Sequence, residues 1–324
     1  MRRIPSIDYL KLLLAAGVVF AHSILIQNNI VNWSFLIGNG VLRSLVPAFS
    51  VLSGYCLYVT YQRGKARKWI LGLIMIYVFW TIFYMPLWIR SVTGVSDVMR
   101  NLVWGPMHLW YVAGLIVAGL FLIALLRLGD RLGWGLWPAL VLALALALVG
   151  SINAYRAFFF YPDMPLEYYR NGLTVIFPFS AAGYAIASYV DRRGLDALPR
   201  AGVIWALVAV FFALRLAEAV YAMRYGISPR SLPEFPLFAY PAALLLFLGF
   251  LRTNLPQPTQ NISLWSASIY FLHIFVIVVI RHFGSNSLAL YFVAGVTVPV
   301  IVAVGFERIM PYLRRGAGAK RALS

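Results

Sequence analysis

A lysine and a histidine, Lys11 and His22, interrupt the first long apolar run of the sequence, IDYLKLLLAAGVVFAHS at residues 7–23. In a helix their spacing brings both to within about 20° of one side, separated by about 16 Å along the axis. Asp8, three residues before Lys11, lies on the same stripe. Ionisable groups inside a membrane helix often mark a substrate or ion pathway. The stripe therefore suggests a polar path from the cytoplasmic face into the protein.

Structural roles for these residues are also open. Asp8 and Lys11 form a helical i,i+3 pair that would anchor the start of the span, with Lys11 extending toward the membrane surface. His22 would then be an interhelical hydrogen-bond partner. The residue types alone do not decide between these roles and a catalytic one.

The composition predicts a membrane protein. Of the 324 residues, 62% are hydrophobic and the mean hydropathy is +0.82, whereas globular domains are about 45–50% apolar. Several stretches approach the roughly 20 apolar residues that a helix needs to cross a bilayer. We expect an all-α integral membrane protein of about ten transmembrane helices, at residues 7–27, 41–61, 69–89, 107–126, 134–150, 171–190, 201–221, 236–251, 263–281 and 288–306.

The basic residues predict the orientation. With a cytoplasmic N-terminus, 17 of the 27 Lys and Arg residues fall on inside segments and 8 on outside segments. This asymmetry follows the positive-inside rule and places both termini in the cytoplasm. The net charge of +17 is thereby explained by topology, and we expect no nucleic-acid partner.

The organisation along the chain is simple. We expect one transmembrane domain at 1–306 and a basic cytoplasmic tail at 307–324. Arg2 and Arg3 before an apolar run resemble a signal peptide, but Asp8 and Lys11 inside that run favour an uncleaved first helix. The single cysteine, Cys56, excludes an internal disulfide and a cysteine-based metal cluster, and no metal site is expected.

The stretch RIPSIDYLKLLLAAGVVFAHS resembles the first helix of the membrane acyltransferase family 3, whose members O-acylate carbohydrates and other acceptors. That family typically carries a basic residue, usually Arg, ten intervening residues before an essential His. Lys11 and His22 occupy these positions. Lys preserves the charge but not the bidentate fork that Arg offers to a phosphate.

Further stretches extend the resemblance over most of the chain. They are FSVLSGYCLYV at 49–59, KARKWILGLIMIYVFWTIFY at 65–84 with Trp80, HLWYVAGLI at 108–116, RNGLTVIFPFSAAGYAIA at 170–187 and SASIYFLHIF at 266–275. Lys11 together with the RNG stretch looks most like bacterial enzymes that O-acetylate exopolysaccharide or related glycans. The resemblance thus implies a multi-pass protein of the bacterial inner membrane.

The resemblance also implies a chemistry. His22 would be the general base that takes the proton of an acceptor hydroxyl, and an acyl-imidazole intermediate is an alternative. Acetyl-CoA would be a substrate from the cytoplasm rather than a bound cofactor. Its phosphates need cations, for which we expect Lys11, Arg67 and Lys68, although a positive-inside anchor explains the turn around Arg67 almost as well.

Other residues are candidates for a substrate cavity. His273 and Tyr270 fall within a span and could line a cavity with His22, Asp8 and Trp80, or could serve packing. Within the outside stretch YRAFFFYPDMPLEYYR at 155–170, aromatic rings could stack on sugars, and Arg170 and the following Asn171 could reach the acceptor. An ordinary interfacial aromatic belt would look similar.

Arg215 and Glu218 are spaced i,i+3 within the seventh predicted span and are expected to pair with each other. A membrane transporter or flippase of a polar or acylated substrate is the alternative function, because ten spans with a few buried charges fit it too. Neither an inverted repeat nor a pair of Gly/Pro-broken helices, the usual signs of such transporters, is evident in the sequence.

Overall fold

The computed structural model describes residues 4–27, 32–224 and 237–321. It is 85% helical, without strands in the described residues, and nine helices in these ranges are long and apolar enough to cross a membrane. The expected all-α integral membrane protein is confirmed. Arg2 and Arg3, which carry part of the predicted inside charge, lie outside the described residues.

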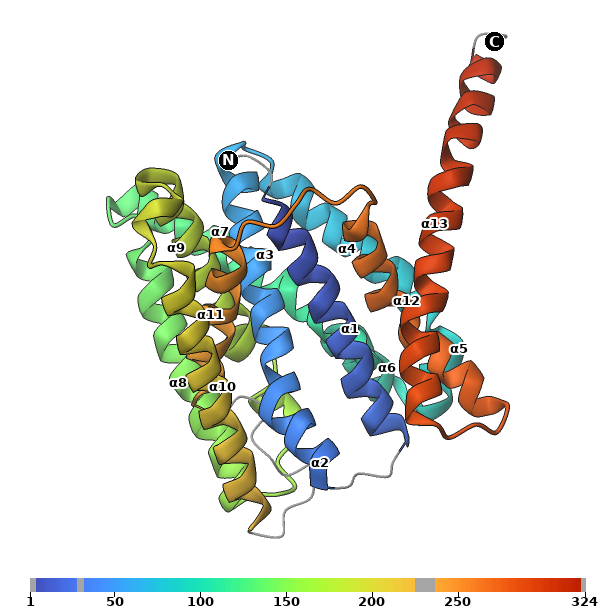
Figure 1. The fold of residues 1–324 in the computed structure, drawn as a ribbon, viewed down its shortest axis with the longest axis horizontal. Coiled ribbons are helices and arrows are strands. Elements are labelled where there is room, and N and C mark those ends of the chain that lie inside the picture. The colour runs from blue at the N-terminus through green and yellow to red at the C-terminus, as the bar shows by residue number, and fades with distance from the viewer. Residues whose placement is uncertain (1–3, 28–31, 225–236, 322–324) are drawn as a thin grey trace. The chain divides into compact units, whose positions relative to one another are not determined.

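The chain divides into two compact units. The smaller unit comprises Asp8–Ile30 and Leu255–Ser324. Within its described residues it contains most of α1 (Pro5–Gln27), together with α12 (Ile262–His282) and α13 (Leu288–Arg321), which is the red helix of Figure 1. The expected tail at 307–324 is described to residue 321, where it continues α13.

Close packing joins the three helices of the smaller unit. Helices α12 and α13 contact one another after the short turn that contains Gly284, whose φ is +84°. A Cβ at Gly295 of α13 would lie 2.7 Å from Cγ1 of Val19 on α1 and 3.6 Å from Ile277 on α12. Only glycine therefore permits this approach without a shift of its neighbours.

Helices α1 and α12 run in the same direction. The first turns of the two helices meet where Lys11 contacts Ser263, and further along His22 contacts His273. At the far end, Gln27 donates to the carbonyl of Asn286, just beyond α12. Because these contacts follow the same order along both helices, α1 and α12 are parallel.

The larger unit comprises Met1–Ile7 and Val31–Asn254. Its longer helices are α3 (Leu45–Gln62), α4 (Ala66–Phe83), α6 (Val95–Trp104), α7 (Trp110–Leu132), α8 (Trp137–Phe159), α9 (Phe177–Arg193), α10 (Ala201–Met223) and α11 (Ala239–Arg252). Its short elements are α2 (Asn32–Phe35), η1 (Leu36–Val41), η2 (Leu42–Ser44), α5 (Met85–Trp88), η3 (Ile89–Ser91), η4 (Met107–Leu109), η5 (Leu166–Tyr168), η6 (Gly172–Ile176) and η7 (Leu195–Ala197).

The centre of the larger unit is the crossing of α3 and α9. A Cβ at Gly54 would lie 1.9 Å from the carbonyl oxygen of Ser180, and one at Gly183 would lie 1.9 Å from that of Val51. The two backbones are therefore in direct contact, which is how small residues promote helix association in membranes. Ser180 also donates to the carbonyl of Ser50 at 3.2 Å.

Two π-helical segments, η1 and η6, precede α3 and α9. Both contain glycine at a tight contact: a Cβ at Gly40 would lie 2.8 Å from Leu216, and one at Gly172 would lie 2.6 Å from the carbonyl oxygen of Gly114. The wider π-helical turn redirects backbone groups, and such turns are frequent at functional sites. Segment η6 and α7 thus form a fixed frame for residues 170–173.

Helix α11 corresponds to the predicted span 236–251, although it has only 14 residues. Six long apolar helices or helical segments lie between α1 and α12 within the described ranges. With six crossings between them, α12 would run antiparallel to α1, whereas with α11 as a seventh crossing it runs parallel. The parallel pair therefore supports α11 as a crossing element and a total of about ten spans.

Candidate functional site

His22 lies on α1, a helix of 23 residues at the beginning of the chain. Pro5 is the first residue of α1, a position that tolerates its missing N–H, and Asp8 in the first turn complements the positive end of the helix dipole. The apolar run then continues to Gln27 without a breaker. Lys11 and His22 therefore lie on one face of one rigid helix, as expected from their spacing.

His22 contacts His273 of α12 directly. The Nδ1 atom of His22 and the Nε2 atom of His273 are 2.8 Å apart, the ring centroids are 5.0 Å apart, and the angle between the ring planes is 16°, so the rings meet edge to edge. His273 has no exposed surface, whereas His22 is half-buried. The sequence placed both residues in one possible cavity, but the direct hydrogen bond across 251 positions is a finding of the structure.

The hydrogen bonds assign the protons of the neutral pair. Nδ1 of His273 lies 2.9 Å from the carbonyl oxygen of Ile269, which only accepts, so this nitrogen is the N–H donor. Nε2 of a neutral His273 is then an acceptor and Nδ1 of His22 is the donor to it. The lone pair of His22 consequently resides on Nε2, so this nitrogen can act as a base.

A second polar contact lies at the first turns of α1 and α12. Lys11 Nζ donates to Asp8 Oδ1 at 3.1 Å and to Ser263 Oγ at 3.2 Å, and Ser263 donates to the same Asp8 oxygen at 2.5 Å. The Asp8 side chain is 6% exposed and that of Lys11 is 28% exposed. Asn261 caps α12 through Leu264 N–H, which fixes the turn that carries Ser263.

This arrangement confirms the geometry of the predicted Asp8–Lys11 pair and adds Ser263, which sequence reasoning did not identify. The partial exposure of Lys11 leaves its ammonium accessible at the end of the unit where both helices begin. Tyr270 lies one turn before His273, with ring centroids 6.4 Å apart, and thus borders the histidine pair. Asp8, Lys11, His22, Tyr270 and His273 are all part of the smaller unit.

The predicted donor-binding residues Arg67 and Lys68 lie in the first turn of α4 in the larger unit, and both are exposed. Cations at a helix N-terminus oppose the helix dipole, so helix stability does not explain them. Membrane orientation and anion binding are the two roles that such a turn supports.

Trp80 belongs to an aromatic cluster in the larger unit. Its ring packs against Phe83 at 5.0 Å and Tyr84 at 6.2 Å between centroids, and Tyr84 in turn packs edge-on against the buried His108 at 5.0 Å. The cluster connects the end of α4 with η4. This geometry is typical of a packed aromatic core.

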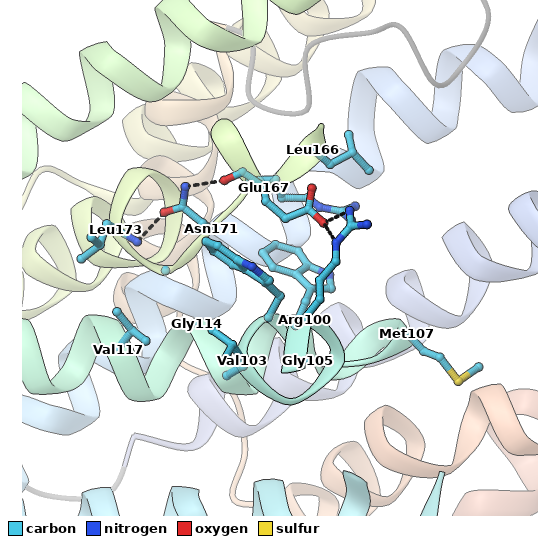
Figure 2. A pocket seen from close by; sticks show the side chains of 15 residues that line it. Arg100, Val103, Gly105, Met107, Gly114, Val117, Leu166, Glu167, Asn171 and Leu173 are labelled. Atoms are coloured by element: carbon cyan, nitrogen blue, oxygen red, sulfur yellow. Dashed lines mark hydrogen bonds and ion pairs between the residues drawn. The ribbon is translucent and has the colours of Figure 1, made fainter. Parts of the chain in front are cut away.

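Arg170 and Asn171 lie at a cavity of about 450 Å³ in the larger unit, between α6, α7 and η6. The amide of Asn171 accepts from Leu173 N–H and donates to the carbonyl of Glu167 (Figure 2). It also accepts from Thr174 N–H. Asn171 is thus the cap of η6, and its amide is used in positioning this turn. The Arg170 guanidinium lies 4.9 Å from the centre of the Trp110 ring.

Sequence reasoning did not identify the opposite charges of this cavity. Arg100 of α6 donates through Nε at 2.9 Å to Oε1 of Glu167, and its Nη2 contacts the same oxygen. Figure 2 shows Glu167 between Arg100 on one side and Asn171 on the other. Arg100 lies about 70 residues before Glu167 and Arg170 in the sequence. Only the tertiary structure brings Arg100 to the other two charges.

In the stretch at 155–170, some aromatic rings are exposed and others make structural contacts. Phe160, Tyr161 and Tyr168 are exposed, and Arg156 lies 5.3 Å from the centre of the Tyr161 ring. Tyr155 instead donates to Glu218 of α10 at 2.7 Å. Exposed aromatic rings at the end of a span fit both sugar stacking and an interfacial belt.

Arg215 is buried in a network larger than the predicted pair with Glu218. Its Nε and Nη2 atoms donate to the carbonyls of Gly40 and Asn39 at 2.7 and 2.6 Å. Glu218 accepts from Tyr155. The π-helical turn of η1 supplies these carbonyls, so Arg215 ties α10 to η1. Removal of one member of such a buried charge network is strongly destabilising, which indicates a structural role.

In the described part of the chain, no three His, Cys, Asp or Glu side chains are arranged to hold a metal ion. The histidine pair consists of a half-buried imidazole, whose Nδ1 is the donor nitrogen, and a buried neighbour that orients it. This arrangement suits abstraction of a proton from a hydroxyl or a thiol.

A comparison with protein families matches residues 4–308 to the model described as an acyltransferase domain. A search of curated proteins found no match, and neither did a search of solved structures. The family match covers nearly the whole chain, including the helices that carry His22, His273 and the residues around the cavity. The chain therefore belongs to the membrane acyltransferase family 3.

Proposed function

We propose that this acyltransferase moves an acetyl group from acetyl-CoA to a hydroxyl of a cell-surface glycan or lipid-linked saccharide, with His22 as the general base. The observation that carries the proposal is the hydrogen bond between His22 Nδ1 and His273 Nε2 at 2.8 Å. It leaves the basic lone pair on Nε2 of His22, as the base of an acyl transfer requires. The enzyme resides in the bacterial cytoplasmic membrane with both termini in the cytoplasm.

The proposed reaction has two proton transfers. As the acceptor oxygen attacks the thioester carbonyl, its proton moves to Nε2 of His22 and a C–O bond forms. The tetrahedral intermediate then collapses, the C–S bond breaks, and the imidazolium returns the proton to the departing thiolate. The products are the acetyl ester and CoA, and His22 is neutral again. His273 holds the Nδ1–H of His22 throughout, which orients the ring.

The cationic groups are proposed to receive the phosphates of the donor. Lys11 is partly exposed and belongs to the same helix as His22, about 16 Å away along the axis. An extended acyl-CoA can bridge such a distance between its reactive thioester and its phosphates. Arg67 and Lys68 add two exposed charges at the start of α4. The predicted topology places Lys11 and this turn near the cytoplasmic face, where acetyl-CoA is found.

Neutralising the basic turn tests the donor assignment. We expect the double variant Arg67→Gln/Lys68→Gln to raise the KM for acetyl-CoA about tenfold, because two exposed charge contacts together contribute roughly 1.4 kcal/mol. The kcat should change less than the KM. The measurement is the release of CoA thiol by membrane vesicles that contain the native acceptors, at matched protein levels.

The matched control is Arg192→Gln/Arg193→Gln, which removes two exposed charges at the end of α9. Its KM should equal that of the wild type. Equal KM values for both double variants and the wild type would contradict the assignment. An equal rise in both would show a general effect of surface charge rather than donor binding.

A transporter or flippase is distinguished by the same assay. It would move its substrate without consuming a thioester, so vesicles containing the wild type would release no more CoA than vesicles without the protein. The proposed acyltransferase requires release of CoA in proportion to ester formed.

A further inference from the structure

The cavity between α6, α7 and η6 combines charged and apolar walls (Figure 2). Its volume of about 450 Å³ lies within the range of small-molecule sites. Its charged lining residues are Arg100, Glu167 and Arg170. The rest of the lining is largely apolar and comprises Val103, Trp104, Met107, Val117 and Leu173. A wholly polar ligand would gain little from such a wall.

The charged wall suits a ligand that carries both an anionic group and hydroxyl groups. Two arginines face one glutamate, so the three charges sum to a positive value. The side chain of Arg100 is 60% exposed, which leaves its guanidinium accessible to an anion in addition to Glu167. The second carboxylate oxygen of Glu167, Oε2, is buried and has no hydrogen-bond partner among the described residues. A buried carboxylate oxygen is stabilised by a donor such as a sugar hydroxyl.

Helix α6 next to the cavity has the character of an interfacial helix. Val95, Met99, Leu102 and Val103 of this helix are exposed apolar residues, while Asp97 and Arg100 are polar. Hydrogen bonds from the Thr93 side chain and backbone N–H hold the pKa of Asp97 below its ordinary value and fix the start of the helix. An amphipathic helix with an exposed apolar face lies at the boundary of headgroups and acyl chains.

We propose that this cavity binds the phosphate-bearing head of a lipid-linked saccharide, with the lipid chain along the apolar wall. Arg170 and Arg100 contact the phosphate. The Glu167 side chain turns its carboxylate toward the ligand on binding, so that Oε2, unpartnered among the described residues, accepts from a sugar hydroxyl. The apolar residues Val103 and Val117 contact the first part of the chain. The inference rests on the proposed function, since it names the acceptor class of the same enzyme, and it makes the lipid phosphate the recognised group.

Binding of farnesyl phosphate to the detergent-solubilised full chain tests the proposal. We expect saturable binding at one site, with farnesol and inorganic phosphate each binding at least tenfold more weakly. The variant Arg170→Gln should weaken the binding of farnesyl phosphate at least tenfold. Arg90→Gln, which removes an exposed arginine outside the cavity lining, is the matched control and should leave affinity unchanged.

A second variant tests the apolar wall and remains informative if Arg170→Gln does not fold. Val117 is an exposed position on α7 that lines the cavity. Val117→Trp should occupy the space of the lipid chain and weaken binding of farnesyl phosphate at least tenfold. Near-wild-type circular dichroism and elution from size-exclusion chromatography would establish that each variant is folded.

Several results would overturn the proposal. They are equal affinity of the wild type and both cavity variants, equally tight binding of farnesol, or equally tight binding of inorganic phosphate, which would indicate a free-anion site. Because no acetyl-CoA is added, the assay is independent of acyl transfer. Binding should persist in His22→Ala, so loss of the proposed chemistry and loss of the lipid site would be separately visible.

Discussion

Replacement of His22 by alanine is expected to lower the rate of acyl transfer by about 10²- to 10⁴-fold, the usual contribution of a positioned general base. The variant removes the nitrogen that takes the acceptor proton but leaves α1 helical, since alanine is the best helix former. His22 is half-buried, so a small residue at this position should still permit membrane insertion. The KM for acetyl-CoA should change little, because the proposed phosphate contacts lie elsewhere.

The measurement is the initial rate of CoA release in membrane vesicles at matched protein levels. His282→Ala provides a matched control, because His282 is an exposed histidine at the end of α12 in the same unit. The control should retain the wild-type rate. A His22→Ala rate within a factor of three of the wild type, with normal membrane levels, would exclude His22 as the base.

Loss of the His273 acceptor should produce the second-largest effect. His273→Leu leaves the Nδ1–H of His22 without this hydrogen bond, so the ring can rotate and populate the other tautomer, in which Nε2 carries the proton. We expect kcat to fall about 10- to 100-fold, less than in a catalytic triad whose orienting carboxylate is replaced. The KM for acetyl-CoA should remain near that of the wild type.

The conservative variant His273→Gln separates positioning from packing. Its side-chain carbonyl reaches the position of the histidine Nε2 and can accept from His22 Nδ1–H. We therefore expect it to recover a large part of the kcat lost in His273→Leu. Equal rates in the two variants would show that His273 serves only to fill space, and a rise in KM without a change in kcat would assign it to substrate binding.

The spans were predictable because a helix in hydrocarbon needs a long apolar sequence. The predicted 7–27 agrees closely with α1, which ends at Gln27. The predicted 69–89 begins three residues late, since the basic first turn of α4 is helical, and extends past the helix end at Phe83, just before Met85-Pro86 begins a separate short turn. Hydropathy alone does not show such breaks. The π-helical segments η1 and η6 also depend on close glycine contacts with other helices.

The candidate site was predictable only where local spacing defines it. Lys11 and His22 share a helix face, so their alignment follows from helix geometry. The partners Ser263 and His273 lie about 250 residues away, and only the packing of α12 on α1 brings them into contact. Asp8–Lys11 was expected as a pair, whereas the charge opposite Arg100 was not, because Glu167 belongs to a distant loop.

The polar contacts of α10 also could not be predicted from local spacing alone. Spacing i,i+3 predicted that Arg215 and Glu218 would pair with each other, but the structure provides other partners for each residue. The two charges do interact with each other, but their hydrogen bonds go elsewhere: Arg215 donates to two carbonyls of η1, and Glu218 accepts from Tyr155. The spacing of charged residues in the sequence does not show which backbone carbonyls will accept their hydrogen bonds. A π-helical turn that presents them is recognised only once the helices are assembled.

The most direct test of the central claim is the amount of ester-linked acetate on surface glycans and glycolipids of cells that lack this protein. These cells would be complemented with the wild type or with His22→Ala at matched membrane levels. The proposed mechanism predicts that the wild type restores the acetate and that His22→Ala does not. Equal restoration by both proteins would show that His22 is not the catalytic base, and acetate unchanged by either would contradict the proposed acceptor class.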